Sequence, residues 1–329
     1  MGRARIPCGT LGGPGLNVLI TGGTGLIGSK IGRLLDAGGH TVVALDIAVP
    51  AASRDLSFLS AVERGSVDEL HMLIRVVEAW KVDVIVHLAA VLGGSSEDDP
   101  LSASRINVIG TLNVFEAARL CKVRRVVTAS SMVVFGSDRE YAGEINDDAP
   151  RLGARRAPIY SAGKIYMEMA GELYRERYGV TVVGLRPSVV YGPGRQSGAT
   201  AFASELITNP ALGKPVRVTE GDAFVSMVYV DDVAAAFCAL ITAREEAFAR
   251  HRFFNTGGDR CTVAQIADAV RKTIPESRIT VEPGGEGEIM GYPTRLADHG
   301  LREEIGFQRN FTPIEVGVAA YVAAIRANT

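Results

Sequence analysis

The sequence predicts an α/β fold in which a doubly wound parallel sheet is joined to a smaller, discontinuous C-terminal lobe. Two observations predict this class. From Asn17 to Arg186, short apolar runs alternate with longer amphipathic segments, and each run is nearly continuous, as in strands buried on both faces of a parallel sheet. After Arg186, glycine and proline punctuate the chain. The regular alternation then loosens, so we expect a loop-rich second lobe.

The expected strands are rich in Val, Ile and Leu, and they are Asn17–Thr21, Thr41–Asp46, Val84–Leu88, Arg125–Ser130 and Val180–Arg186. The amphipathic segments between and after them predict helices at Leu26–Ala37, Asp68–Trp80, Ile106–Cys121 and Tyr160–Tyr178. Alternation at this spacing implies right-handed crossovers. Farther along, Ser226–Leu240 has the pattern of a strand followed by a helix, which could return to the main sheet.

Composition excludes several classes of protein. A formal net charge of −2 gives no electrostatic footprint for nucleic acid or for an anionic membrane. No run of apolar residues is long enough to span a membrane. The four cysteines, Cys8, Cys121, Cys238 and Cys261, have neither paired nor metal-binding spacing. This favours reduced thiols, no metal site and a cytoplasmic location.

Three glycines in the segment TGGTGLIG follow the first strand and open the first helix. Gly22 permits a tight turn, Gly25 lets the backbone approach a pyrophosphate, and Gly28 allows the helix to pack closely on the strand. The unpaired N–H groups of the helix N-terminus favour a diphosphate at this position. This pattern predicts a dinucleotide-binding Rossmann domain.

Asp46 ends the second strand, where a carboxylate can accept hydrogen bonds from a ribose diol. No basic residue follows it before Arg54, so a 2′-phosphate would meet an acid with no cation nearby. We therefore expect NAD rather than NADP.

We expect three units along the chain. Residues 1–16 have no apolar signal region and are predicted to form a flexible leader. Residues 17–187 and 227–256 are assigned to the NAD-binding Rossmann domain, and residues 188–226 and 257–329 to a substrate-binding lobe.

Tyr160 and Lys164 lie one helical turn apart on the same face of a predicted helix. Neither is a useful base alone at neutral pH, because a free Tyr titrates near 10 and a free Lys near 10.4. Beside a cationic nicotinamide, however, opposite charge favours the phenolate. Ser131 follows a strand expected to end on the cofactor side of the sheet, where its hydroxyl can hold a substrate oxygen.

These motifs resemble those of the extended short-chain dehydrogenases/reductases, and most closely the NAD-dependent epimerase/dehydratase family, whose best-known members act on nucleotide sugars. The resemblance covers Asn17 to about Phe307. It is carried by TGGTGLIG, Asp46, His87–Ala90, Asn107–Thr111, Ser131, YSAGK, Leu185–Ser188, Tyr191–Gly194, Tyr229–Val233 and Asn255–Gly258.

The resemblance implies roles for single residues. Tyr160 would be the catalytic acid/base, Lys164 would bind the nicotinamide ribose and lower the pKa of the tyrosine, and Ser131 would polarise the reacting group. His87 and Asn107 are expected to be structural rather than chemical. The residues expected to contact the cofactor are Gly22, Gly25, Leu26, Ile27, Gly28, Asp46, Ser66, Val67, Leu88, Ala89, Ala90, Asn107, Tyr160, Lys164, Pro187 and Val189. The residues expected to contact the substrate are Ser131, Met132, Ser188 and Arg195.

The sequence departs from the family pattern at three places. Met132 follows Ser131 where family dehydratases carry an Asp-Glu pair, so dehydration is not expected. Ser66 stands where many relatives place an adenine-binding Asp. Val225 occupies the position of an Arg that binds the diphosphate of nucleotide sugars, and Val cannot replace it.

Three functions remain open. The first is a sugar epimerase, in which hydride leaves a carbinol and returns to the opposite face of a keto intermediate. The second is an NAD-dependent dehydrogenase of a small polyol, sugar acid or hydroxy acid. The third is a non-catalytic NAD-binding sensor, against which the intact Ser131, Tyr160 and Lys164 set argues. By resemblance, the helices at Ile106–Cys121 and Tyr160–Tyr178 would form a homodimer interface.

Overall fold

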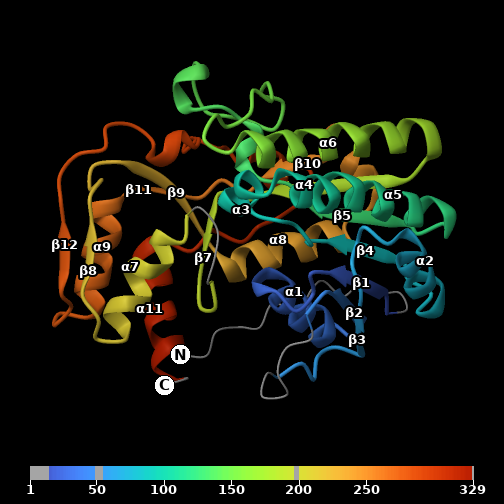
Figure 1. The fold of residues 1–329 in the computed structure, drawn as a ribbon, viewed down its shortest axis with the longest axis horizontal. Helices are drawn as coiled ribbons and strands as arrows, with labels where there is room; N and C mark the ends of the chain where they lie inside the picture. The colour runs from blue at the N-terminus through green and yellow to red at the C-terminus, as the bar shows by residue number, and fades with distance from the viewer. Residues whose placement is uncertain (1–14, 49–54, 196–199, 328–329) are drawn as a thin grey trace.

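The computed structural model describes residues 15–48, 55–195 and 200–327. The expected leader lies almost entirely outside them, as does Arg54. Seven parallel strands form the main sheet in the order β10-β6-β5-β4-β1-β2-β3 (Figure 1). They are β1 (Asn17–Thr21), β2 (Thr41–Asp46), β3 (Ala61–Arg64), β4 (Val84–His87), β5 (Arg125–Ala129), β6 (Thr181–Arg186) and β10 (Phe253–Asn255). The predicted doubly wound α/β fold is confirmed.

Helices cover both faces of this sheet. On one face α1 (Leu26–Ala37) packs against α8 (Val230–Thr242), and on the other α2 (Leu70–Ala79) packs against α5 (Thr111–Leu120), which packs against α6 (Pro158–Tyr178). Apolar strand residues point to each face, such as Val18 and Ile20 toward the first layer and Leu19 toward the second. These alternating contacts explain why the strands read as continuous apolar runs.

The helix predicted at Ile106–Cys121 is interrupted. A short helix, α4 (Pro100–Ala103), leads into a π-helical segment at Ser104–Gly110, and α5 follows from Thr111. A π-helical turn changes the direction in which its side chains point relative to a regular α-helix. It directs Asn107 at the loop after β4.

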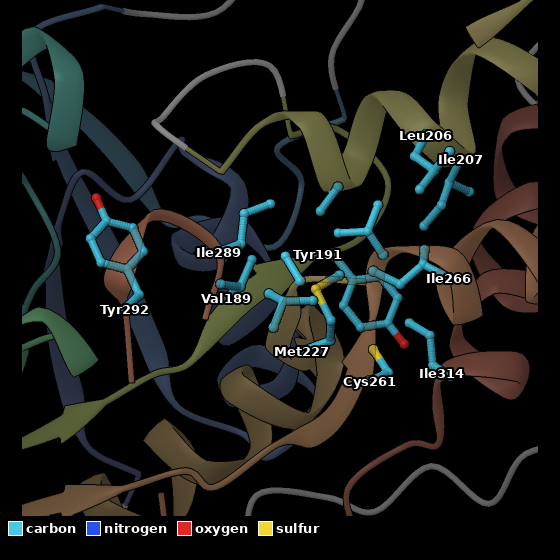
Figure 2. Close-up of a cluster of buried hydrophobic side chains, with 14 of the residues drawn as sticks. Val189, Tyr191, Leu206, Ile207, Met227, Cys261, Ile266, Ile289, Tyr292 and Ile314 are labelled. Carbon is cyan, nitrogen blue, oxygen red and sulfur yellow. The ribbon is translucent and has the colours of Figure 1, made fainter. Parts of the chain in front are cut away.

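The second lobe has two small sheets. A three-stranded sheet has the order β11-β9-β7 and a two-stranded sheet pairs β12 with β8. These strands are β7 (Val189–Tyr191), β8 (Val216–Val218), β9 (Phe224–Tyr229), β11 (Asp259–Thr262) and β12 (Ile279–Val281). The remaining α-helices in the described ranges are α3 (Gly93–Asp98), α7 (Phe202–Ala211), α9 (Val263–Thr273), α10 (His299–Glu303) and α11 (Ile314–Arg326). Of these, α3 lies after β4 and packs against α6. Figure 2 shows the core of the second lobe, where side chains of β7, β9, β11, α7 and α9 meet.

The strand predicted within Ser226–Leu240 does not return to the main sheet. It forms β9, which pairs with β7 and β11 because its alternate residues Val225 and Met227 are buried in the second core. Only the following helix, α8, packs on the main sheet. The edge strand next to β6 is instead β10. The sequence pattern did not identify β10 or β3, the strand at the opposite edge.

Two acidic residues near the start of α8 do not cap it. The helix begins at Val230 after Tyr229, without a capping side chain. Asp231 pairs with Lys30 of α1 at 2.8 Å, and Asp232 accepts a hydrogen bond from Thr312 N at 2.7 Å. These carboxylates therefore join α8 to its neighbours. Among the described residues, none of the helices has the length and apolarity needed to cross a bilayer.

Candidate functional site

The glycine-rich turn after β1 leaves no room for side chains. Gly22 has φ +69°, a conformation that L side chains rarely adopt, and a Cβ there would lie 3.0 Å from Ala89 N. A Cβ on Gly28 would lie 2.6 Å from Gly22 O. The turn, the loop after β4 and the first turn of α1 are thus packed backbone against backbone, as a dinucleotide-binding turn requires.

The N-terminus of α1 suits an anion. Its N-cap is Gly25, without a capping side chain, and its first turn, which includes Leu26 and Ile27, contains no acidic residue. Its N–H groups and the positive end of the helix dipole are therefore suited to a diphosphate. At the end of β2, Asp46 Oδ2 accepts from Thr24 Oγ1 at 2.6 Å and from Thr24 N at 3.2 Å. This fixes the carboxylate beside the turn, and the residues fit NAD.

Two further predicted cofactor residues, Ser66 and Val67, follow β3 at the same edge of the sheet. The Ser66 side chain is hydrogen-bonded to Asp68 and lowers the pKa of that carboxyl. Val67 is buried, and its carbonyl accepts from Asn113 Nδ2 at 3.1 Å. Both residues are therefore held by hydrogen bonds just after β3.

The loop after β4, which contains Leu88, Ala89 and Ala90, is preceded by a residue whose side chain is fixed by hydrogen bonds. His87 is buried between Thr21 Oγ1 at 2.8 Å and Thr111 Oγ1 at 3.0 Å. Burial lowers the pKa of His87 to about 3, so the ring stays neutral and structural.

Asn107 holds the next part of this loop. Its Oδ1 accepts from Val91 N, and its Nδ2 donates to Val91 O, both at 2.8 Å. Both oxygen and amide nitrogen of Asn107 are thus used to fix backbone, which agrees with a structural role.

The structure brings Ser131, Tyr160 and Lys164 together at the carboxyl end of β5. Lys164 Nζ donates to Ala129 O at 2.6 Å and lies 5.5 Å from the centroid of the Tyr160 ring. Burial lowers the pKa of Lys164 to about 8, while burial raises the pKa of Tyr160 to about 12 and its hydrogen bond to Ser131 acts in the opposite direction. Without the cofactor, the phenol is therefore held protonated at neutral pH.

Two more groups act electrostatically on the phenol of Tyr160. The charge of Arg195 lowers the pKa of the phenol, and the phenol of Tyr292 raises it. Arg195 donates hydrogen bonds to Val190 O and, at 2.6 Å, to Thr200 Oγ1. Tyr292 lies far along the chain and carries no local motif, so sequence reasoning missed it (Figure 2).

The other predicted residues take various places. Met132 is buried in the second core, and its N–H donates to Pro187 O at 3.1 Å. Ser188 is buried, donates to Gly257 O and accepts from Ser226 Oγ at 3.1 Å. Val189 begins β7. The hydroxyl of Ser188 thus joins two separate segments of the second lobe, β9 and the residues just before β11.

Three basic residues could compensate for the missing diphosphate-binding arginine, namely Arg195, Arg217 and Arg295, and two of them are bound to other partners. Val225 is 1% exposed within the second core. Arg217 pairs with Glu282 on the surface, and Arg295 binds the backbone oxygens of Asp138 and Tyr141. Arg195 is the one of the three candidates whose charge acts on the phenol of Tyr160.

A buried ion pair lies one helical turn beyond Lys164. Glu168 is 0% exposed and accepts from Arg186 Nε and Nη2, both at 2.8 Å, and from Arg151 Nη1 at 3.1 Å. It also accepts from Ser130 Oγ at 2.5 Å, next to Ser131. This network ties α6 to β5 and β6 directly beneath the site.

Comparison with known proteins agrees with this geometry. A model of the NAD-dependent epimerase/dehydratase family matches residues 18–257. The chain is 30% identical to UDP-glucose 4-epimerase of Mycolicibacterium smegmatis over 294 residues, 86% of this chain and 88% of that protein. It is 26% identical to mitochondrial L-threonine 3-dehydrogenase of Bos taurus, covering 89% of this chain and 79% of that protein.

Among solved structures, L-threonine dehydrogenase from Cupriavidus necator has 26% identity and a TM-score of 0.81, covering 95% of this chain and 99% of that chain. These matches confirm the predicted α/β fold, an NAD-dependent enzyme and NAD as its cofactor. The chain belongs to the NAD-dependent epimerase/dehydratase family of extended short-chain dehydrogenases/reductases.

Proposed function

We propose that the enzyme oxidises a secondary alcohol on a small, carboxylate-bearing substrate. The observation that carries this proposal is the positive charge of Arg195, which is close enough to Tyr160 to lower the pKa of its phenol. A guanidinium attracts and hydrogen-bonds a carboxylate. The Nη1 and Nη2 groups of Arg195 donate to Val190 O and Thr200 Oγ1, so a substrate carboxylate would share or replace these bonds. The buried Val225 supports a substrate without a diphosphate, because no cation replaces the expected arginine at that position.

The proposed chemistry uses three side chains of this chain. Ser131 binds the alcohol oxygen and the phenolate of Tyr160 takes the hydroxyl proton, while the carbon-bound hydrogen departs with its electron pair. NAD, when bound, supplies the hydride acceptor and a positive charge that favours the phenolate. Lys164 binds the nicotinamide ribose and adds a second positive charge near the phenol.

A second candidate is epimerisation of a nucleotide sugar, which the 30% identity to a UDP-glucose 4-epimerase favours. The same three residues would serve it, with hydride returned to the opposite face of the keto intermediate. This reaction requires the cofactor to stay bound through turnover.

The first experiment is to measure the nucleotide released when freshly purified protein is denatured, together with an NAD-binding titration. We expect little bound NAD, measurable NAD affinity, and NADH formation at 340 nm with a member of a panel that includes L-threonine, small hydroxy acids and sugar acids. Near-stoichiometric NAD and conversion of UDP-glucose without net NADH would replace this proposal by the second candidate. Released NADP would contradict the role assigned to Asp46.

Tyr160→Phe tests the chemical assignment. It keeps the ring but removes the proton acceptor, so we expect turnover to fall by about a hundredfold or more. NAD affinity should stay close to that of the wild type in the same titration. Retained turnover would contradict the role of Tyr160.

We also propose a homodimer in the cytoplasm, formed through α5 and α6. Large apolar side chains remain exposed on these helices, including Leu120 on α5 and Tyr166, Met169 and Leu173 on α6. Such a patch favours association. We expect a dimer in sedimentation and a monomer for Met169→Glu/Leu173→Glu; a monomeric wild type would contradict the proposal.

A further inference from the structure

The first turn of α6, which carries Tyr160, receives no cap from its own segment. The residue before the helix is Ala157, which makes no side-chain capping hydrogen bond. Pro158 opens the helix and has no N–H. The first donors that need a partner are therefore the N–H groups of Ile159 and Tyr160.

Glu97 of α3 supplies this partner. Its Oε1 accepts from Ile159 N at 3.1 Å and from Tyr160 N at 3.2 Å. Helix α3 contacts α6, near the N-terminal end of the longer helix (Figure 1). A carboxylate in this place satisfies two donors and faces the positive end of the helix dipole. The capping residue lies 62 residues earlier in the chain, so no local sequence motif predicts this cap.

The segment that carries Glu97 is continuous with the loop after β4 at the cofactor site. That loop is fixed at Val91, which exchanges two hydrogen bonds with Asn107. Ser96 Oγ then donates to Val91 O at 2.8 Å, which ties α3 to the same point. One ordered segment thus reaches from the predicted nicotinamide side to the backbone of the catalytic tyrosine.

We infer that Glu97 is a positioning residue for the reaction. It fixes the first turn of α6 so that the phenol of Tyr160 remains within hydrogen-bonding reach of Ser131. It acts as an acceptor of two backbone N–H groups and exchanges no proton with the substrate. The inference rests on the proposed role of Tyr160.

The test uses the full chain, with NAD as the added ligand. Exchange of the Ile159 and Tyr160 amide protons is followed by NMR, and a ¹³Cζ-tyrosine label reports the phenol. The chain has nine tyrosines, and the signal of Tyr160 is the one lost in Tyr160→Phe. Glu97→Gln keeps an oxygen acceptor. Asp98→Ala is the matched control, because it removes the neighbouring exposed carboxylate, which has no hydrogen bond to α6 within the described ranges.

In Glu97→Ala, we expect both amide protons to exchange about tenfold faster, the size typical of a lost helix cap. We also expect the phenol signal to lose most of its response to NAD. Glu97→Gln and Asp98→Ala should behave like the wild type in both measurements. Recovery by the Gln variant separates acceptor geometry from charge.

Two results would overturn the inference alone. One is an unchanged NAD response of the phenol signal in Glu97→Ala, and the other is a Gln variant as impaired as the Ala variant. If the phenol signal of the wild type fails to respond to bound NAD, the proposed role of Tyr160 fails, and the inference fails with it.

Discussion

Replacing Glu168 by Gln tests the buried ion pair beneath the site. The side chains of Glu168 and Arg186 are 0% and 4% exposed, and two of their hydrogen bonds are 2.8 Å long. The amide of Gln still offers one oxygen, but the buried guanidinium loses its ion-pair partner and keeps only the longer-range attraction of Asp147 and Glu172. Breaking a buried pair from one side costs about 3–5 kcal/mol. We expect a value near the lower end, about 3 kcal/mol, because Asp147 O also accepts from Arg186.

The assay is urea unfolding, together with the melting temperature. At roughly 2–4 °C for each kcal/mol in a large domain, the variant should melt about 6–12 °C lower. Glu172→Gln is the control. Glu172 lies on the same helix as Glu168 and forms a partly exposed ion pair with Arg151, so breaking this pair should cost less than about 1 kcal/mol. If Glu168→Gln destabilises no more than Glu172→Gln does, the buried pair does not hold α6 against β6, and the reasoning is refuted.

Three further predictions concern the cofactor side. Burial lowers the pKa of Lys164 to about 8, below the usual value of 10.5, so the unfolded chain binds more protons between these values and stability rises with pH there. Lys164→Met should raise the free energy of unfolding at pH 7 and flatten this rise, and an unchanged profile in urea unfolding at pH 7 to 10 would contradict the shift. Gly22→Ala should weaken NAD binding about tenfold or more in calorimetry, because of its positive φ and the close Ala89 backbone; Gly143→Ala, whose Cβ meets open space, is the control. Asp46→Ala should lower NAD affinity by about tenfold and narrow the preference over NADP, and an unchanged NAD/NADP ratio would contradict the ribose contact.

The parts of the site that the sequence predicts are those specified by neighbouring residues. The glycine turn, Asp46 and the Tyr160–Lys164 pair each depend on the spacing within one strand, turn or helix. Tyr292 and Glu97 depend on contacts between distant segments, and a single Tyr or Glu has no periodic signal. Their places became visible only once the second lobe and α3 were packed against α6.

The fold shows the same division. Long apolar strands such as Thr41–Asp46 were identified because they are buried on both faces. The three residues Phe253–Asn255 are too short for a period, and their pairing with β6 decides that they form a strand. The sequence pattern of β9 is compatible with either the main sheet or the three-stranded sheet. The burial of Val225 and Met227 in the second core decides which strands it pairs with.

The place of β10 at the end of the main sheet has a consequence for synthesis on the ribosome. Its neighbour β6 ends at Arg186, but β10 begins only at Phe253. At a synthesis rate of about 5–20 residues per second, β10 emerges several seconds after β6, and the edge of β6 stays unpaired during this time. During that interval unpaired N–H and C=O groups of an apolar strand are available to other nascent chains. The vulnerable stage of biogenesis is therefore the emergence of the second lobe, when a chaperone would have most to protect.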